Sequence, residues 1–167
     1  MAIIKAICLS EKKGTAKHPV KEAKLVENYG LEGDAHAGNW HRQVSLLSFE
    51  KVQEFKVLLD ESKGLLAEKP SQDSDRINMI TDGCFGENLL IEGIDLRNLP
   101  VGTLLEGGDF LLEVTQIGKE CHSHCQIAEA VGKCIMPTEG IFAKVVKGGT
   151  IKPGDRIEIR AKSAVRL

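Results

Sequence analysis

The sequence predicts one mainly β domain over residues 1–167. Most apolar residues lie in short runs rich in β-branched side chains, and Gly, Pro, Asn or Asp residues separate these runs. A chain of 167 residues falls within the usual size of one domain and can bury most of its unfolded surface. The hydrophobic fraction of 42% and the charged fraction of 28% are ordinary for a globular protein and indicate neither disorder nor membrane insertion.

The expected strands share β-branched positions and flanking turn residues. They are Ile3–Ser10, Val20–Glu27, Gln43–Leu47, Glu87–Ile91, Thr103–Glu106, Phe110–Ile117, Ile141–Lys147 and Arg156–Arg160. Gly107-Gly108 is placed to join two of them as a hairpin. Residues 152–155, Lys-Pro-Gly-Asp, fit a type II turn, because Pro fixes φ at the second position and Gly allows positive φ at the third.

Two helices interrupt the strands. The first is expected over Phe49–Asp60, with Ser48 as its N-cap. Its apolar stripe, which we expect to face the core, is formed by Phe49, Val52, Phe55, Leu58 and Leu59. The second is short, His124–Val131, because Ser123 and Gln126 have the spacing of a capping box and Gly132 is placed to end the helix.

Charge and targeting signals exclude several classes of partner. With 22 basic and 24 acidic side chains, the formal charge of -2 provides no broad positive field for a nucleic acid. The first ten residues are interrupted by Lys5 and are too short for a signal peptide, and no segment approaches the ~20 apolar residues of a membrane span. We therefore expect a cytoplasmic protein, in which the five cysteines are free thiols available for catalysis or metal binding. The sequence does not predict an oligomeric state.

Residues 121–125, Cys-His-Ser-His-Cys, form the least ordinary stretch of the chain. A helix N-terminus or a nearby imidazolium stabilises a thiolate, which is the nucleophilic and metal-binding form of cysteine. Cys121 and Cys125, with His122 beside them, are therefore candidates for reactive sulfur. The alternatives are buried, inert cysteines, or a structural zinc site completed by Cys84 or Cys134. Because zinc sites usually combine two separated ligand pairs and only one pair is evident here, the zinc alternative is the weaker one.

Two glycine-rich loops carry further candidates. Residues 30–42 bring Asp34, His36 and Arg42 into one loop, where backbone N–H groups and a guanidinium could bind an anion such as a phosphate. Residues 82–89 place Glu87 and Asn88 at the head of a strand, where they could line a pocket or simply cap the strand. An ordinary turn with solvated polar residues remains the alternative at both places.

Several segments together resemble the MOSC family, which is named after the C-terminal domain of molybdenum cofactor sulfurases. They occur in order along nearly the whole chain: residues 30–36 (GLEGDAH), 42–47 (RQVSLL), 85–89 (FGENL), 92–95 (EGID), 114–116 (VTQ) leading to Cys121, and 148–155 (GGTIKPGD). The resemblance implies a single MOSC domain folded as a closed Greek-key β-barrel of the PK β-barrel type, with a few short helices.

The resemblance also implies the chemistry. The family's cysteine, counted from Thr115-Gln116, falls on Cys121, which would carry persulfide sulfur or bind the molybdenum of the molybdenum-pterin cofactor. Asp34, His36, Arg42, Glu87, Asn88, His122 and Cys125 are the expected cofactor-binding residues. The Glu120 that precedes Cys121, and the additional His122, His124 and Cys125, depart from the pattern of several relatives.

The resemblance leaves three functions open. The first is a sulfur carrier or cofactor-binding module that acts with a separate cysteine desulfurase or molybdoenzyme. The second is a molybdenum-dependent enzyme that reduces N-hydroxylated compounds, and the third is a zinc-stabilised structural or adaptor protein. A chain of 167 residues cannot contain the pyridoxal-phosphate-dependent desulfurase domain of the large sulfurases, so pyridoxal phosphate is not expected here.

Overall fold

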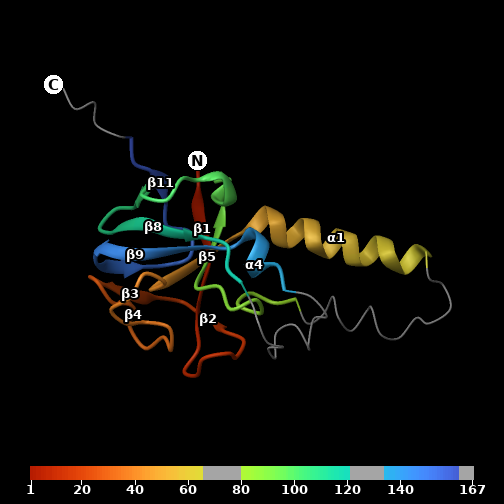
Figure 1. Cartoon of the computed structure of the whole chain (residues 1–167), viewed down its shortest axis with the longest axis horizontal. Helices are drawn as coiled ribbons and strands as arrows, with labels where there is room; N and C mark the ends of the chain where they lie inside the picture. Colours follow the sequence, from red (N-terminus) through yellow and green to blue (C-terminus); the bar gives the residue numbers. More distant parts are fainter. Residues whose placement is uncertain (66–79, 121–133, 162–167) are drawn as a thin grey trace.

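The computed structural model describes residues 1–65, 80–120 and 134–161, and shows a mainly β fold (Figure 1). Eight strands form a mixed sheet in the order β11-β7-β8-β9-β5-β6-β1-β2, and three form a second sheet in the order β10-β3-β4. The strands of the larger sheet are β1 (Ile3–Leu9), β2 (His18–Val20), β5 (Val44–Ser48), β6 (Leu89–Glu92), β7 (Leu104–Glu106), β8 (Leu111–Ile117), β9 (Ile141–Lys147) and β11 (Glu158–Ile159). The smaller sheet contains β3 (Ala23–Val26), β4 (Gly30–Leu31) and β10 (Gly149–Ile151).

The helices of the described residues lie around the larger sheet. They are α1 (Phe49–Leu65), the short α4 (Met136–Glu139) and a 3-10 turn, η1 (Leu96–Asn98). β5 and β6 pair in parallel, and α1 lies between them in the chain, as a parallel pair needs a crossover connection. Figure 1 shows α1 projecting to one side of the strands. None of the described helices is both long and apolar enough to cross a membrane.

Two apolar clusters cover the two faces of the central strands. The first includes Ile4, Leu46 and Leu89 of the larger sheet together with Leu25 and Ile151 of the smaller one, so it lies between the sheets. The second lies beneath α1, where Val52 and Phe55 of the helix pack with Leu47, Leu90 and Phe142. Because β1, β5 and β6 face one cluster with alternate residues and the other cluster with the rest, their sequences are nearly continuous apolar runs.

The closed Greek-key barrel expected from the resemblance is not found among the described residues. β1 does form backbone hydrogen bonds with the segment just before β11: Ile4 N donates to Asp155 O at 2.9 Å, and Gly154 N donates to Ile4 O at 2.7 Å. The only strand pairing there is an isolated bridge between Ile3 and Arg156. The mainly β architecture with few helices is confirmed, whereas the strand pairing stops short of a closed ring.

Most of the expected elements are present, with shifted ends. β9 has the predicted bounds, and the type II turn is confirmed by Gly154, at φ +95°, and by the hydrogen bond from Asp155 N to Lys152 O at 3.1 Å. Of the strand expected over Val20–Glu27, residues Ala23–Val26 form β3, and Val20 is the last residue of β2. The prediction that Leu58 faces the core is wrong, because 62% of this residue is exposed. The expected helix His124–Val131 lies outside the described residues.

We predict that Leu46→Ala lowers the free energy of unfolding by about 2–5 kcal/mol, because Leu46 is fully buried between the sheets and its truncation leaves a cavity. Urea denaturation followed by circular dichroism measures the change. Leu58→Ala on α1 is the matched control and should change stability by less than about 0.5 kcal/mol. Equal losses in the two variants would contradict this assignment of the core.

Candidate functional site

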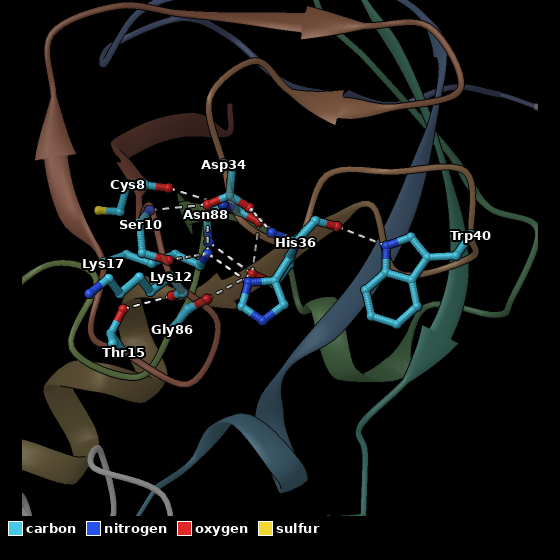
Figure 2. A network of polar contacts seen from close by, with 11 residues as sticks. Cys8, Ser10, Lys12, Thr15, Lys17, Asp34, His36, Trp40, Gly86 and Asn88 are labelled. Atoms are coloured by element: carbon cyan, nitrogen blue, oxygen red, sulfur yellow. Dashed lines mark hydrogen bonds and ion pairs between the residues drawn. The ribbon is translucent and has the colours of Figure 1, made fainter.

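A buried ion pair organises the loops at one end of β1. Lys17 lies in the connection from β1 to β2, and its Nζ is 2.7 Å from Oδ1 of Asp34, which follows β4. The two side chains are only 1% and 0% exposed. Lys17 Nζ also donates to Ser10 Oγ at 3.2 Å and lies 3.0 Å from His36 Nδ1 (Figure 2). One ammonium group therefore joins three segments that are separate in sequence.

Asp34 has both carboxylate oxygens engaged within the protein. Oδ1 accepts from Ser10 N at 3.1 Å as well as from Lys17, and Oδ2 accepts from His36 N at 3.2 Å. Asp34 was expected to bind the cofactor, and that role stays a prediction, because the contacts that the structure describes for it lie within the protein. It shapes the glycine-rich loop from inside and holds the backbone of His36.

His36 is half-buried and its imidazole is neutral at neutral pH. Burial is the main cause that lowers its pKa to about 4, and the charges of Lys17, Lys119 and Lys13 act in the same direction. Asp34 opposes them without reversing the shift. The His36 carbonyl accepts a hydrogen bond from Trp40 Nε1 at 2.8 Å, so both the N–H and the C=O of the His36 backbone are hydrogen-bonded.

Arg42 is a cation stacked on aromatic rings. Its guanidinium carbon lies 4.6 Å from the centre of the Trp40 ring and 5.6 Å from that of Phe142. Its Nε is buried without a hydrogen-bond partner, and no carboxylate among the described residues forms an ion pair with it. A buried guanidinium N–H without an acceptor is costly, so this group is left to donate to a water molecule or to a ligand atom.

The end of β8 is attached to the same loop. His41 Nε2 lies 2.8 Å from Gln116 Oε1, and the Thr115 hydroxyl donates to the His41 carbonyl. Gln116 Nε2 in turn donates to Gly118 O at 2.8 Å. These contacts bring the residues that lead into the 121–125 segment next to the 30–42 loop. Cys121, His122 and Cys125 themselves lie outside the described residues, so their predicted roles stay predictions.

Glu87 and Asn88 are each 1% exposed and hold a turn in place. Glu87 accepts from Gly83 N at 2.7 Å and from Phe85 N at 3.1 Å. Burial raises the pKa of Glu87 to about 7 and outweighs these backbone hydrogen bonds, which act to lower it. Asn88 Oδ1 accepts from Ser45 N at 3.0 Å, and its Nδ2 donates to the carbonyl of Cys8 at 3.0 Å. Of the two readings of this segment, capping of the strand end fits these contacts.

This turn also supports Lys17. Lys17 N donates to Gly83 O at 2.9 Å, and a Cβ added to Gly83 would lie 2.3 Å from Lys17 O. Gly83 has φ +89°, a backbone conformation that residues with a side chain rarely adopt. Both this conformation and the close approach of the Lys17 carbonyl therefore require glycine. Lys17 was missed by the sequence analysis, because its partners Asp34 and Gly83 lie in distant loops.

The described cysteines do not provide a metal site. Burial raises the pKa of the Cys8 thiol, and it raises that of Cys84 to about 12. Cys134 is half-buried, with its Sγ 4.0 Å from the Phe85 carbonyl. Within residues 1–65, 80–120 and 134–161, no three His, Cys, Asp or Glu side chains are placed to hold a metal ion. Cys8 and Cys84 therefore fit the reading of small buried side chains.

Comparison with protein families identifies the fold. The MOSC domain model matches residues 33–158, which include the 30–42 loop from Gly33 onwards and extend to β11. The chain belongs to the MOSC family. Among curated protein sequences, none matches this MOSC chain.

Several solved structures have a similar fold. The YuaD protein from Bacillus subtilis is similar with a TM-score of 0.68 and 18% identity, over 94% of this chain and 94% of that chain. YiiM from Escherichia coli has a TM-score of 0.62 and 19% identity, over 96% of this chain and 71% of that one. YiiM from Geobacillus stearothermophilus has a TM-score of 0.65 and 19% identity, over 99% and 78%. At these identities the likeness shows the fold of this MOSC chain.

We predict that Lys17→Met lowers the free energy of unfolding by about 3–5 kcal/mol, because it leaves Asp34 as an uncompensated buried charge. Urea denaturation at neutral pH measures this loss. Lys152→Met removes a lysine from an exposed pair with Glu22, whose side chains are 63% and 58% exposed, and should cost less than about 1 kcal/mol. Similar losses in both variants would show that the Lys17–Asp34 pair does not hold the loops.

Proposed function

We propose that this MOSC protein binds the molybdenum-pterin cofactor, or carries sulfur for it, with Cys121 as the reactive thiol. The observation that carries this proposal is the Arg42 guanidinium, which is stacked on Trp40 and Phe142 while its buried Nε lacks an acceptor. A phosphate oxygen supplies such an acceptor, and arginine binds phosphate through charge-assisted hydrogen bonds. Arg42, together with the half-buried His36, whose carbonyl is hydrogen-bonded to the same Trp40, would hold the phosphate end of the cofactor.

The local charge also supports an anionic ligand. The whole chain has a net charge of -2, yet Lys13, Lys17 and Lys119 all shift the pKa of His36 downward. Lys13 Nζ additionally lies 5.7 Å from the centre of the Trp40 ring. The charge of Asp34 is already matched by Lys17. Because Lys17 and Asp34 offset each other, Lys13 and Lys119 are the lysines that add positive charge near His36 and Trp40, and such a surface favours an anion.

The thiol part of the proposal rests on the sequence and on the attachment of β8. Lys119, two residues before Cys121 in the chain, is close enough to His36 for its charge to lower the pKa of that imidazole. Cys121 would then bind molybdenum or carry persulfide sulfur at the edge of the same site. In the sulfur-carrier form, a separate cytoplasmic cysteine desulfurase would supply the sulfur and a molybdoenzyme would receive the cofactor.

We predict that Arg42→Gln reduces the molybdenum and pterin retained by protein purified from a molybdenum-replete host about 10-fold or more. Loss of a charge-assisted hydrogen bond costs about 1.5–3 kcal/mol, and each 1.4 kcal/mol is a factor of about ten in affinity. Arg160→Gln is the matched control, because Arg160 is half-exposed and pairs with Glu106 on the far edge of the sheet. Elemental analysis and pterin fluorescence measure the content.

The thiol is tested in the same way. Cys121→Ala should abolish molybdenum or sulfur binding with the fold intact, whereas Cys8→Ala should cost only packing, since Cys8 is a fully buried residue of β1. Zinc in place of molybdenum would favour the structural alternative, and a reductase assay with an N-hydroxylated compound separates the enzyme from the carrier. Full molybdenum content in both Arg42→Gln and Cys121→Ala would overturn the proposal.

We predict that Cys121 or Cys125 alkylates faster than Cys8 at neutral pH. The expected helix N-terminus and the neighbouring imidazoles stabilise a thiolate, whereas burial raises the pKa of Cys8 and Cys84. Iodoacetamide labelling at several pH values, read by peptide mass spectrometry, gives the rate at each thiol. If all five cysteines react only near or above the ordinary thiol pKa of about 8.5, the sulfur-carrier function loses its chemical basis.

A further inference from the structure

The contact between Lys17 and His36 fixes which ring nitrogen carries the proton. Lys17 Nζ lies 3.0 Å from His36 Nδ1, and an ammonium group has three N–H donors and no acceptor. Nδ1 must therefore present its lone pair to Lys17. In a neutral imidazole the proton then resides on Nε2.

We infer that Lys17 is a positioning residue that keeps His36 as a neutral Nε2–H donor, and that this N–H binds an oxygen of an oxyanion held together with Arg42. The inference rests on the proposed function for its ligand, and it adds the direction of the hydrogen bond and the residue that sets it. Asp34 and Ser10 complete the arrangement.

Neither Lys17 nor the His36 backbone is free to reorient. The three donors of Lys17 match three acceptors: Asp34 Oδ1 at 2.7 Å, His36 Nδ1 at 3.0 Å and Ser10 Oγ at 3.2 Å. The His36 backbone is held by Asp34 Oδ2 on its N–H and by Trp40 Nε1 on its carbonyl. Figure 2 shows the imidazole beside Lys17 and Asp34 at the edge of this network. Rotating the ring would break its contact with Lys17.

The other ring nitrogen is available to a ligand. Among the described residues, His36 Nε2 has no hydrogen-bond partner, and the ring is half-buried. A ligand atom that meets an Nε2–H group must accept a hydrogen bond, as phosphate oxygens do. While Lys17 donates to Nδ1, the protonated Nε2 has no free lone pair with which to bind a metal ion or accept a proton. His36 therefore favours a ligand oxygen that accepts a hydrogen bond over a metal ion or a proton donor.

The charges that face His36 stabilise this state over a wide pH range. Lys17, Lys119 and Lys13 disfavour a second proton on the ring, and Asp34 is the carboxylate that opposes them. Burial and these lysines lower the pKa of His36 to about 4. The Nε2–H donor thus remains neutral throughout the physiological range, unlike an ordinary histidine with a pKa of about 6.5.

The test is nitrogen-15 NMR of the imidazoles in the cofactor-free protein of residues 1–167. His36 is assigned by its absence in His36→Gln, and long-range proton–nitrogen spectra report the tautomer. We expect a single tautomer with the proton on Nε2 and no protonation until the pH falls to about 4. Inorganic phosphate, used as the probe, should shift the Nε2 resonance saturably in wild type.

Two variants separate positioning from a merely structural effect. Lys17→Met should return His36 to a mixture of tautomers that protonates closer to 6.5, the ordinary value. Lys21→Met, an exposed lysine just after β2, should leave the His36 spectrum unchanged. If Lys17→Met does not fold, the wild-type tautomer, its pH titration and its phosphate response still decide the question.

Three results would overturn the inference: a wild-type ring with its proton on Nδ1 or shared between both nitrogens, no response of Nε2 to phosphate, or an unchanged tautomer in folded Lys17→Met. None of these measurements requires molybdenum. The cofactor content of Arg42→Gln therefore judges the proposed function separately, and failure of one conclusion can be told from failure of the other.

Discussion

The buried pair of Lys17 and Asp34 is the interaction on which the candidate site depends. Removing two charges from water is costly, and their attraction offsets this cost only if the remaining hydrogen-bonding groups are also satisfied. Here Ser10, His36 and the backbone satisfy them. The pair thereby links the end of β1, the β1–β2 connection and the glycine-rich loop. Through Gly83, the Lys17 backbone also positions the turn that contains Glu87.

The same pair determines which charges remain for a ligand. Because the charge of Asp34 is neutralised internally by Lys17, it does not compete for Arg42. Arg42 is instead held by aromatic rings, which orient a guanidinium without neutralising it. Lys13 and Lys119 then add positive charge near His36, where both act to lower the pKa of the imidazole. A slightly acidic protein can thus contain an anion site, because charge is matched locally rather than over the whole chain.

The sequence predicted the longer strands well and the shorter ones poorly. β1, β8 and β9 are long enough for their β-branched and apolar residues to indicate a strand. β4 and β10 are strands of 2 and 3 residues, too short for any periodicity, and tertiary pairing with β3 creates them. Leu58 was assigned to the core by its spacing alone, but 62% of it is exposed, whereas its neighbour Leu59 packs against the cluster beneath α1.

Within the site, the sequence indicated the correct loop without giving the role of each residue. Asp34, His36 and Arg42 are close in sequence and resemble a set of ligands, yet the structure engages them in the buried network to different degrees. Asp34 is fully engaged inside, His36 has one ring nitrogen inside and one available, and Arg42 has no described partner. The roles of Asp34 and His36 are set by Lys17, which lies 17 and 19 residues away from them in the sequence, so the sequence did not reveal these roles. It follows that replacing Asp34 would impair binding through the shape of the loop, whereas replacing Arg42 would impair it directly, and the loss of stability would be larger for Asp34, because its replacement leaves Lys17 as an uncompensated buried charge.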